Sequence, residues 1–344
     1  MSERDLLARC TIVIPTHRRA AYLRRAVAWF AEIGTPIVVA DSSETASLAG
    51  SERAGIAAYV HRPGGFEAFV GKLAEAAAAV STPYAALCAD DDLTLPGGLA
   101  RSIAFLDRNE DHSFAQGYAY LYQVLGPRLA VWPMPYHAHD VPHQDWRDRI
   151  DAATSTVFYG VQRTAVLRRS LGFLVRAGIG PLGSDAIGLI DFAITVIAAR
   201  AGKFHRVPVP FALREYSPSV SGIGFRFRTI VSPLIPAFYA ALLDELAGPD
   251  AADPETRLRL LRRFGGDYAG QISYDLAVGM APQRRLDRLP RAVRDHPGRL
   301  ALAEYAYRWL VSKRLFAARA YRGQDVIFRT GDYARARAVL LPGG

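Results

Sequence analysis

The sequence predicts an α/β fold, in which helices flank a mostly parallel sheet, with a helical C-terminal appendage. Two observations point to it. Short apolar runs alternate with amphipathic helical patterns through the first hundred residues. Aspartates follow two of these runs directly, where neighbouring parallel strands would bring them together. Half of the 344 residues are hydrophobic and 22% are charged, which is typical of a packed globular protein. We expect the α/β domain over residues 1–224 and the helical region over 225–344.

Strands and helices alternate from the first strand onward. The run "CTIVIPT" (10–16) is rich in β-branched residues and predicts a buried strand, and "RRAAYLRRAVAWFAEI" (18–33) has apolar residues at helical spacing. A second strand over 36–43, a helix over 65–81 and a third strand over 84–89 repeat the pattern. This order gives parallel strands joined by crossover helices, whose ligands gather at the carboxyl ends of the strands.

The rest of the chain is less regular. Residues 112–160 are rich in Tyr, His and Pro, and we expect irregular structure there, such as a lid or one wall of a binding site. Residues 181–213 predict a helix closed by Gly202 and then a short strand, and Arg- and Ala-rich helices follow residue 225. The longest apolar stretch, 186–199, is too short to span a bilayer. The first ten residues contain no signal-peptide core, and we expect a cytoplasmic protein.

The net charge of +9 leaves several partners open. Basic residues occur as Arg pairs beside acidic residues, without a nucleic-acid-binding motif, and we expect no nucleic-acid partner. A basic face could equally bind the anionic inner surface of a membrane, a phosphorylated sugar donor or an acidic acceptor. The basic C-terminal helices are compatible with peripheral membrane contact or with a homo-oligomer interface. Cys10 and Cys88 lie in or beside apolar runs and predict core residues rather than a disulfide.

Three consecutive aspartates are the strongest chemical signal. In "YAALCADDDLTLPGG" (84–98) an apolar run ends in Asp90, Asp91 and Asp92. Carboxylates are the hard oxygen ligands that suit Mg²⁺ or Mn²⁺, and such ions are commonly shared with phosphates. The alternative is an N-terminal cap for the following helix, which one aspartate would satisfy. The triplet therefore predicts a divalent cation that neutralises charge on a departing diphosphate.

Other common sites are not indicated. The sequence contains no phosphate-binding P-loop, no G-x-G-x-x-G turn after the first strand and no G-x-S-x-G elbow. His137, His139 and His143 cluster without a cysteine pair or H-E-x-x-H spacing, which favours a polar loop over a zinc site.

Three segments in order carry a resemblance to a known family. "TIVIPTHRRAAYLRRAV", "IVVADSS" and "YAALCADDDLTLPGGL" resemble the family 2 glycosyltransferases of the GT-A (Rossmann-like) fold, as in a divergent bacterial member. The resemblance covers about residues 10–222. It implies an inverting sugar transfer from a nucleotide-sugar donor, linked to UDP, GDP, dTDP or CMP, to an acceptor hydroxyl with Mn²⁺ or Mg²⁺. It suggests a glycan, lipid-linked or protein acceptor, as in polysaccharide biosynthesis.

The resemblance also implies roles for donor-side residues. Pro15, Thr16 and Arg18 would line the nucleotide pocket, Asp41 would face the base, and Lys72 would lie near the diphosphate. Setting the proline that follows the family's D-x-D-D motif on Pro96 makes Asp91 and Asp92 the metal ligands. The first acid then falls on Ala89, a departure from the family. Either Asp90 compensates beside Asp91, or Asp90 and Asp92 form a D-x-D pair themselves.

The acceptor side has two candidate bases. The family's base stands about eleven residues before a helix-closing glycine, which from Gly202 gives Asp191, preceded by Ile190 rather than the usual Glu. A carboxylate within an apolar helix is costly unless it is functional or bonded to backbone or an arginine. Asp185 is the rival base. Arg214 would lie near the donor phosphates, and Tyr216 stands where some members carry a metal-binding His.

Two other functions are compatible with the same residues. A non-catalytic nucleotide- or sugar-binding protein of this fold would explain the missing acids, and it would bind nucleotides without hydrolysing donors. A nucleotidyltransferase would also use an aspartate-held metal, but the turn "PTHRRA" lacks the glycines expected there. We favour the sugar transferase.

Overall fold

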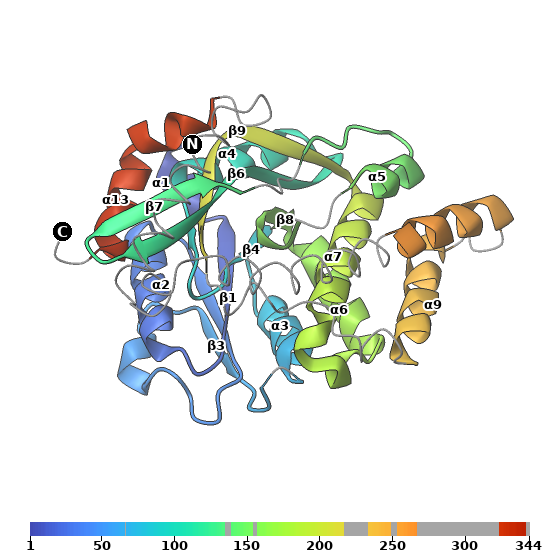
Figure 1. Ribbon diagram of the computed structural model, residues 1–344, viewed down its shortest axis with the longest axis horizontal. Helices are drawn as coiled ribbons and strands as arrows, with labels where there is room; N and C mark the ends of the chain where they lie inside the picture. Colours follow the sequence, from blue (N-terminus) through green and yellow to red (C-terminus); the bar gives the residue numbers. More distant parts are fainter. Residues whose placement is uncertain are drawn as a thin grey trace, which may run out of the picture.

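The computed structural model describes residues 1–65, 67–134, 139–153, 157–216, 233–248, 253–266 and 323–341, without the side chains of Ser184 and Asp185. It confirms the α/β fold: a curled sheet lies between helices (Figure 1). The strand order is β3-β2-β1-β4-β8-β6-β9-β5, and β7 pairs with β6.

The first half of the sheet is parallel, as the alternating pattern predicts. Its strands are β1 (Cys10–Thr16), β2 (Ile37–Asp41), β3 (Ala58–His61) and β4 (Tyr84–Leu87). Helices α2 (Ala20–Glu32) and α3 (Phe69–Ala78) provide two of the crossovers. The bounds of β1 match the predicted run. Strand β3 was not predicted from the sequence, because its side chains are only partly buried.

The second half of the sheet is mixed. Its strands are β5 (Leu93–Thr94), β6 (His112–Leu125), β7 (Arg128–Pro133), β8 (Val161–Arg163) and β9 (Lys203–Glu215). The prediction of irregular structure over 112–160 was wrong for most of this segment. Strands β6 and β7 form an antiparallel hairpin that turns at Gly126, whose φ is 58°. The aromatic residues that suggested a loop are the strand formers of β6, because aromatic side chains pack well on a pleated sheet.

Helices cover both faces of the sheet. The remaining α-helices are α1 (Glu3–Leu7), α4 (Pro96–Arg108), α5 (Trp146–Ala152), α6 (Thr164–Arg176), α7 (Ile187–Ala201), α9 (Leu234–Ala247) and α13 (Gly331–Leu340). Short 3₁₀ helices are η1 (Gly50–Arg53), η2 (Val157–Tyr159), η3 (Gly180–Ala186) and η6 (Gln324–Arg329), and residues 254–266 are helical. Helix α7 ends one residue before Gly202, as predicted, but β9 is longer than expected.

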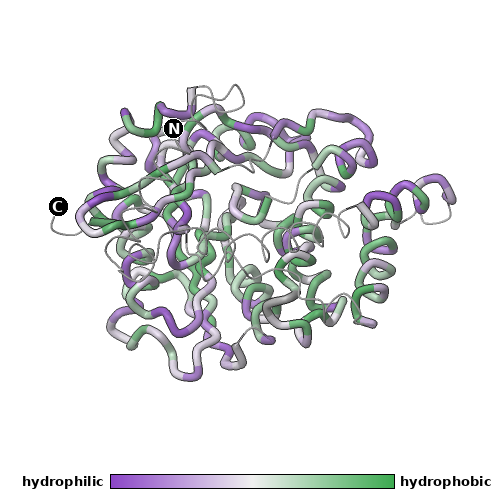
Figure 2. Tube along the Cα trace, in the orientation of Figure 1, coloured by the Kyte–Doolittle hydropathy of each residue, from purple (hydrophilic) through white to green (hydrophobic). Residues whose placement is uncertain are grey.

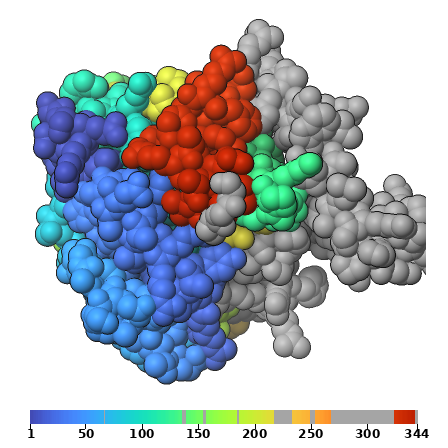
Figure 3. All heavy atoms as spheres, turned by 90° about the vertical axis from the view of Figure 1, so that its left-hand side faces the viewer, coloured from blue at the N-terminus to red at the C-terminus, as the bar shows by residue number. Residues whose placement is uncertain are grey.

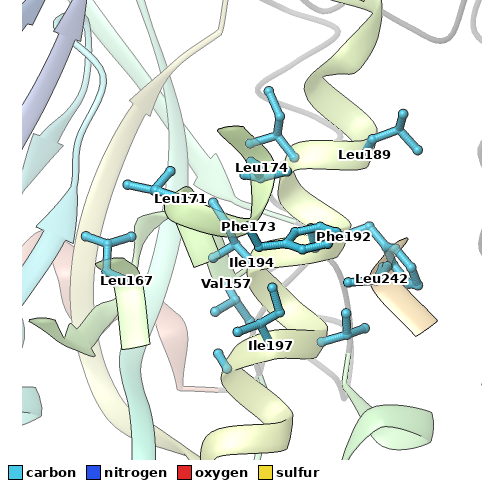
Figure 4. Close-up of a cluster of buried hydrophobic side chains, with 14 of the residues drawn as sticks. Val157, Leu167, Leu171, Phe173, Leu174, Leu189, Phe192, Ile194, Ile197 and Leu242 are labelled. Atoms are coloured by element: carbon cyan, nitrogen blue, oxygen red, sulfur yellow. The ribbon is translucent and has the colours of Figure 1, made fainter. Parts of the chain in front are cut away.

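Two hydrophobic cores lie on the two faces of the sheet. Along β1, Val13 points to one core, whereas Ile12 and Ile14 point to the other, as the two-residue period of a strand requires. The first core includes α6 and α7, whose buried side chains meet Leu242 of α9 (Figure 4). Hydrophobic residues concentrate along the central strands and inner helices, and hydrophilic ones in the outer segments (Figure 2). Cys10 and Cys88 are buried free thiols in the second core, as predicted.

The described C-terminal residues pack into these cores. Ile327 of η6 and Leu340 of α13 join the second core, and this segment lies against the N-terminal residues (Figure 3). The Asp332 carboxylate accepts a hydrogen bond from the Gly97 N–H at 2.8 Å, in the first turn of α4. Helix α4 begins four residues after the aspartate triplet, so α13 contacts the helix that follows the triplet. Among the described residues, no helix is long and apolar enough to cross a bilayer.

Candidate active site

Three neighbouring strands end at one edge of the sheet. Thr16 ends β1 beside Asp41 at the end of β2, and residues 90–92 follow β4, which pairs with β1 on its other side. Parallel pairing therefore brings the predicted donor-side residues together, as the sequence indicates.

Asp90 is the least exposed of the three aspartates, and it contacts the end of the first strand. Its carboxylate accepts a hydrogen bond from the Thr16 hydroxyl at 2.6 Å and pairs with Arg19 at 3.0 Å. The side chain is only 3% exposed. Burial raises the pKa of Asp90 to about 6, although the Thr16 hydrogen bond and the charge of Arg19 oppose this rise.

Asp91 and Asp92 also have cationic partners. The Asp91 carboxylate pairs with the other guanidinium nitrogen of Arg19 at 2.8 Å. The Asp92 carboxylate pairs with Arg214 at 3.2 Å and accepts a hydrogen bond from the Glu215 N–H at 2.8 Å. Burial raises the pKa of Asp92, and the Arg214 charge opposes it. Two arginines from distant segments thus hold the three aspartates.

Arg19 was not among the predicted residues, although it stands beside Arg18. Arg18 has a left-handed backbone (φ 55°), and its side chain is 66% exposed and paired with Glu44. The next residue, Arg19, turns inward to the triplet. The sequence offers two adjacent arginines, but only the backbone of the turn decides which one enters the site.

Asp41 is held by its own strand end. Its carboxylate accepts hydrogen bonds from Ser43 N–H at 2.9 Å, Ser47 N–H at 2.7 Å and the Tyr59 hydroxyl at 2.6 Å. Burial would raise the pKa of Asp41, but these hydrogen bonds, with one from the Ser43 hydroxyl, lower it to about 2. The carboxylate is therefore ionised, and in this structure it orders the loop after β2.

Lys72 lies beneath the same edge. Its ammonium donates to the Thr16 carbonyl at 2.6 Å and to the Ser42 hydroxyl at 2.9 Å, and the residue is 1% exposed. Burial lowers the pKa of Lys72 to about 8, against the charges of Asp41 and Asp90. This buried cation fixes the end of β1. Pro15 precedes Thr16 within the buried strand.

Arg214 links the triplet to the predicted base. Its guanidinium lies over the Tyr159 ring at 3.8 Å, in addition to its contact with Asp92. Burial lowers the pKa of Arg214, but Tyr159, Asp92 and Asp191 together raise it, so Asp191 lies within electrostatic reach of this arginine. Asp191 is in the first half of α7, and the hydroxyl of Thr195 donates to its backbone carbonyl at 2.8 Å.

The other predicted residues lie around this centre. Asp185 is in η3, one turn before α7, and its side chain lies outside the described residues. The Tyr216 ring lies 5.6 Å from the Trp132 ring, at the end of β9. Among His137, His139 and His143, the first lies outside the described residues, and His139 Nε2 lies 3.0 Å from the Ala152 carbonyl oxygen.

A hydrogen-bonded layer under Asp91 was also missed. The Tyr122 hydroxyl donates to the Asp91 carbonyl at 2.6 Å, and Arg25 donates to the same carbonyl at 3.0 Å. The Tyr22 hydroxyl contacts Glu215 at 3.3 Å. These residues come from α2, β6 and β9, so only the folded arrangement reveals them.

The donor set of the triplet suits a divalent cation, since three carboxylates follow one strand. Asp91 is the most accessible of them, with a side chain 12% exposed against 3% for Asp90 and 5% for Asp92. As arranged, however, the carboxylates face arginines, and no group of three or more His, Cys, Asp or Glu in the described part of the chain is placed to hold a metal ion. Carboxylates are ligands of the kind that Mg²⁺ or Mn²⁺ takes, and binding here would require them to leave their arginine partners.

The comparisons with known proteins point to glycosyltransferases. Residues 11–171 match the model of Glycosyl transferase family 2. No curated protein matches the chain in sequence.

Solved structures of S. aureus TarS share the fold. TarS 1-349 in complex with UDP is 14% identical with a TM-score of 0.52, over 97% of this chain and 88% of that chain. The same protein in complex with UDP-GlcNAc is 14% identical with a TM-score of 0.50, over 97% and 89%. The chain spans about half, 54%, of a longer TarS structure, with 14% identity and a TM-score of 0.49.

Proposed function

We propose that the protein is an inverting glycosyltransferase, which moves a sugar from a nucleotide-sugar donor to an acceptor hydroxyl with a divalent cation. The proposal rests on the position of Arg214. This arginine contacts Asp92 of the triplet and lies within electrostatic reach of Asp191. One cation thus connects the donor-side carboxylates with the predicted base. The TarS structures contain UDP or UDP-GlcNAc, which supports a nucleotide-diphosphate donor.

The donor would lie at the edge formed by β1, β2 and β4. Asp91 and Asp92, with Asp90 beside them, would hold the cation, which would neutralise the charge that develops on the diphosphate. Lys72, Arg19 and Arg214 add positive charge at the same edge, where a diphosphate would be stabilised.

The acceptor would approach from the side of α7. Asp191 accepts the proton of the acceptor hydroxyl, and the oxygen attacks the anomeric carbon as its bond to the nucleotide diphosphate breaks. A single displacement inverts the configuration of that carbon.

Donor turnover tests this function. The protein is incubated with UDP-, GDP-, dTDP- and CMP-sugars, with Mn²⁺ or with a chelator, and nucleotide release is followed together with the anomer of the freed sugar by proton NMR. With water as a slow acceptor, we expect one donor to be cleaved, only with the cation, and the first anomer seen to be inverted. A freed sugar with retained anomeric configuration would contradict the single displacement. Nucleotide binding without release would favour the non-catalytic alternative.

A further inference from the structure

Arg19 covers the aspartate triplet from outside. Its two terminal nitrogens contact Asp90 at 3.0 Å and Asp91 at 2.8 Å. Its side chain is 33% exposed, whereas those of the two aspartates are 3% and 12% exposed. The arginine side chain is therefore more exposed than the two carboxylates that it contacts, and it occupies one oxygen of each.

The turn after β1 holds Arg19 in this place. The backbone N–H of Arg18 donates to the Ser43 hydroxyl at 2.8 Å, and the left-handed conformation of Arg18 sends its own side chain outward. Arg19 is the N-cap residue of α2 and makes no side-chain capping hydrogen bond, and its guanidinium lies 4.2 Å from the centre of the Tyr22 ring. A strained backbone position costs free energy, which here is offset by the contacts that it permits.

A cation that takes Asp90 Oδ1 or Asp91 Oδ2 must displace Arg19, whose two terminal nitrogens contact these oxygens. A divalent ion alone would leave the guanidinium without its partners, so the gain from metal binding is reduced by the loss of two ion pairs. A nucleotide diphosphate offers the displaced guanidinium new acceptors, because arginine pairs with phosphate in the same forked geometry as with carboxylate.

We propose that Arg19 is a positioning residue that exchanges partners: it leaves Asp90 and Asp91 for the donor diphosphate when the cation enters. The cation and the nucleotide then strengthen each other's binding, since each removes part of the cost that the other would otherwise meet. The site takes up the cation together with the diphosphate and resists the cation alone. This inference rests on the proposed function.

Two titrations of the whole chain test it. Binding of Mn²⁺ is followed by the electron paramagnetic resonance signal of the free ion, with and without UDP, for wild type, Arg19→Met and Arg24→Met. The Arg24→Met variant is the matched control, because it removes an arginine of the same helix that forms an exposed pair with Glu52. Melting temperatures check folding, and Arg19→Lys provides a second variant that keeps the charge but not the fork that spans two carboxylates.

We expect Arg19→Met to bind Mn²⁺ alone about tenfold more tightly than wild type, and UDP to strengthen Mn²⁺ binding less in this variant, by the size of a typical coupling. Arg19→Lys should lie between, and Arg24→Met should behave as wild type. Equal affinity of wild type and Arg19→Met for Mn²⁺ alone would overturn the inference. If UDP binds to neither protein under any condition, the proposed function fails instead, and the Mn²⁺ titration without UDP distinguishes the two.

Discussion

Replacing Asp191 with asparagine should lower kcat for sugar transfer by about a thousandfold, within the range that a positioned general base contributes. The amide keeps the size of the side chain but cannot accept the proton. Nucleotide affinity and melting temperature should remain close to those of wild type, because the proposed donor contacts are made by the strand ends. The measurement is single-turnover transfer with saturating donor, together with nucleotide titration of the same sample.

Asp185→Asn is the matched control for this prediction. Asp185 lies in η3, six residues before Asp191, and is the other carboxylate that the sequence offers as a base. The account predicts a small effect for Asp185→Asn. A reversal, with Asp185→Asn inactive and Asp191→Asn active, would move the base to η3. Retention of activity in both variants would contradict a carboxylate base at this end of α7.

Replacing Arg214 with methionine should destabilise the protein by about 3 kcal/mol, the lower end of the cost of breaking a buried ion pair. The Asp92 carboxylate is 5% exposed and would lose the cation that contacts it, whereas the arginine side chain is itself 25% exposed. We choose the lower end because partial exposure screens part of the interaction. Urea unfolding measures the change.

Two further variants separate this effect from a general loss of charge. Arg24→Met breaks a surface pair with Glu52, in which the side chains are 54% and 35% exposed, and should cost less than about 1 kcal/mol. In the Arg214→Met background, Asp92→Asn should restore part of the lost free energy of unfolding, because it removes the carboxylate charge that has lost its arginine partner. An Arg214→Met variant as stable as Arg24→Met would show that the pair does not hold the triplet.

The parallel half of the fold could be predicted because its signals are local. Each buried strand is a short apolar run, and each crossover helix has its own period, so the pattern of residues 10–89 predicts these elements and their order, apart from the partly buried β3. The triplet was visible for the same reason. The hairpin of β6 and β7 was missed because Tyr-rich segments indicate a strand only where a neighbouring strand pairs with them.

The sequence indicated which residue types gather at this edge of the sheet, but not their contacts. The choice between Arg18 and Arg19 depends on one left-handed φ, which no composition rule gives for an arginine. Asp41 was assigned to the base of the nucleotide, yet its oxygens bind Ser43, Ser47 and Tyr59, two of them within its own loop. Such partners come from tertiary packing, which a motif does not encode.

The most direct test of the central claim is a thermal-shift panel of UDP, GDP, CMP and dTDP, each with and without Mn²⁺, on wild type and Asp91→Ala. A ligand at a hundred times its Kd that binds only the folded protein adds about 2.7 kcal/mol of stability, which is readily seen. The account predicts stabilisation of wild type by one nucleotide, dependent on Mn²⁺ and lost in Asp91→Ala. No shift with any nucleotide, or an equal shift in the variant, would contradict a donor site at the aspartate triplet.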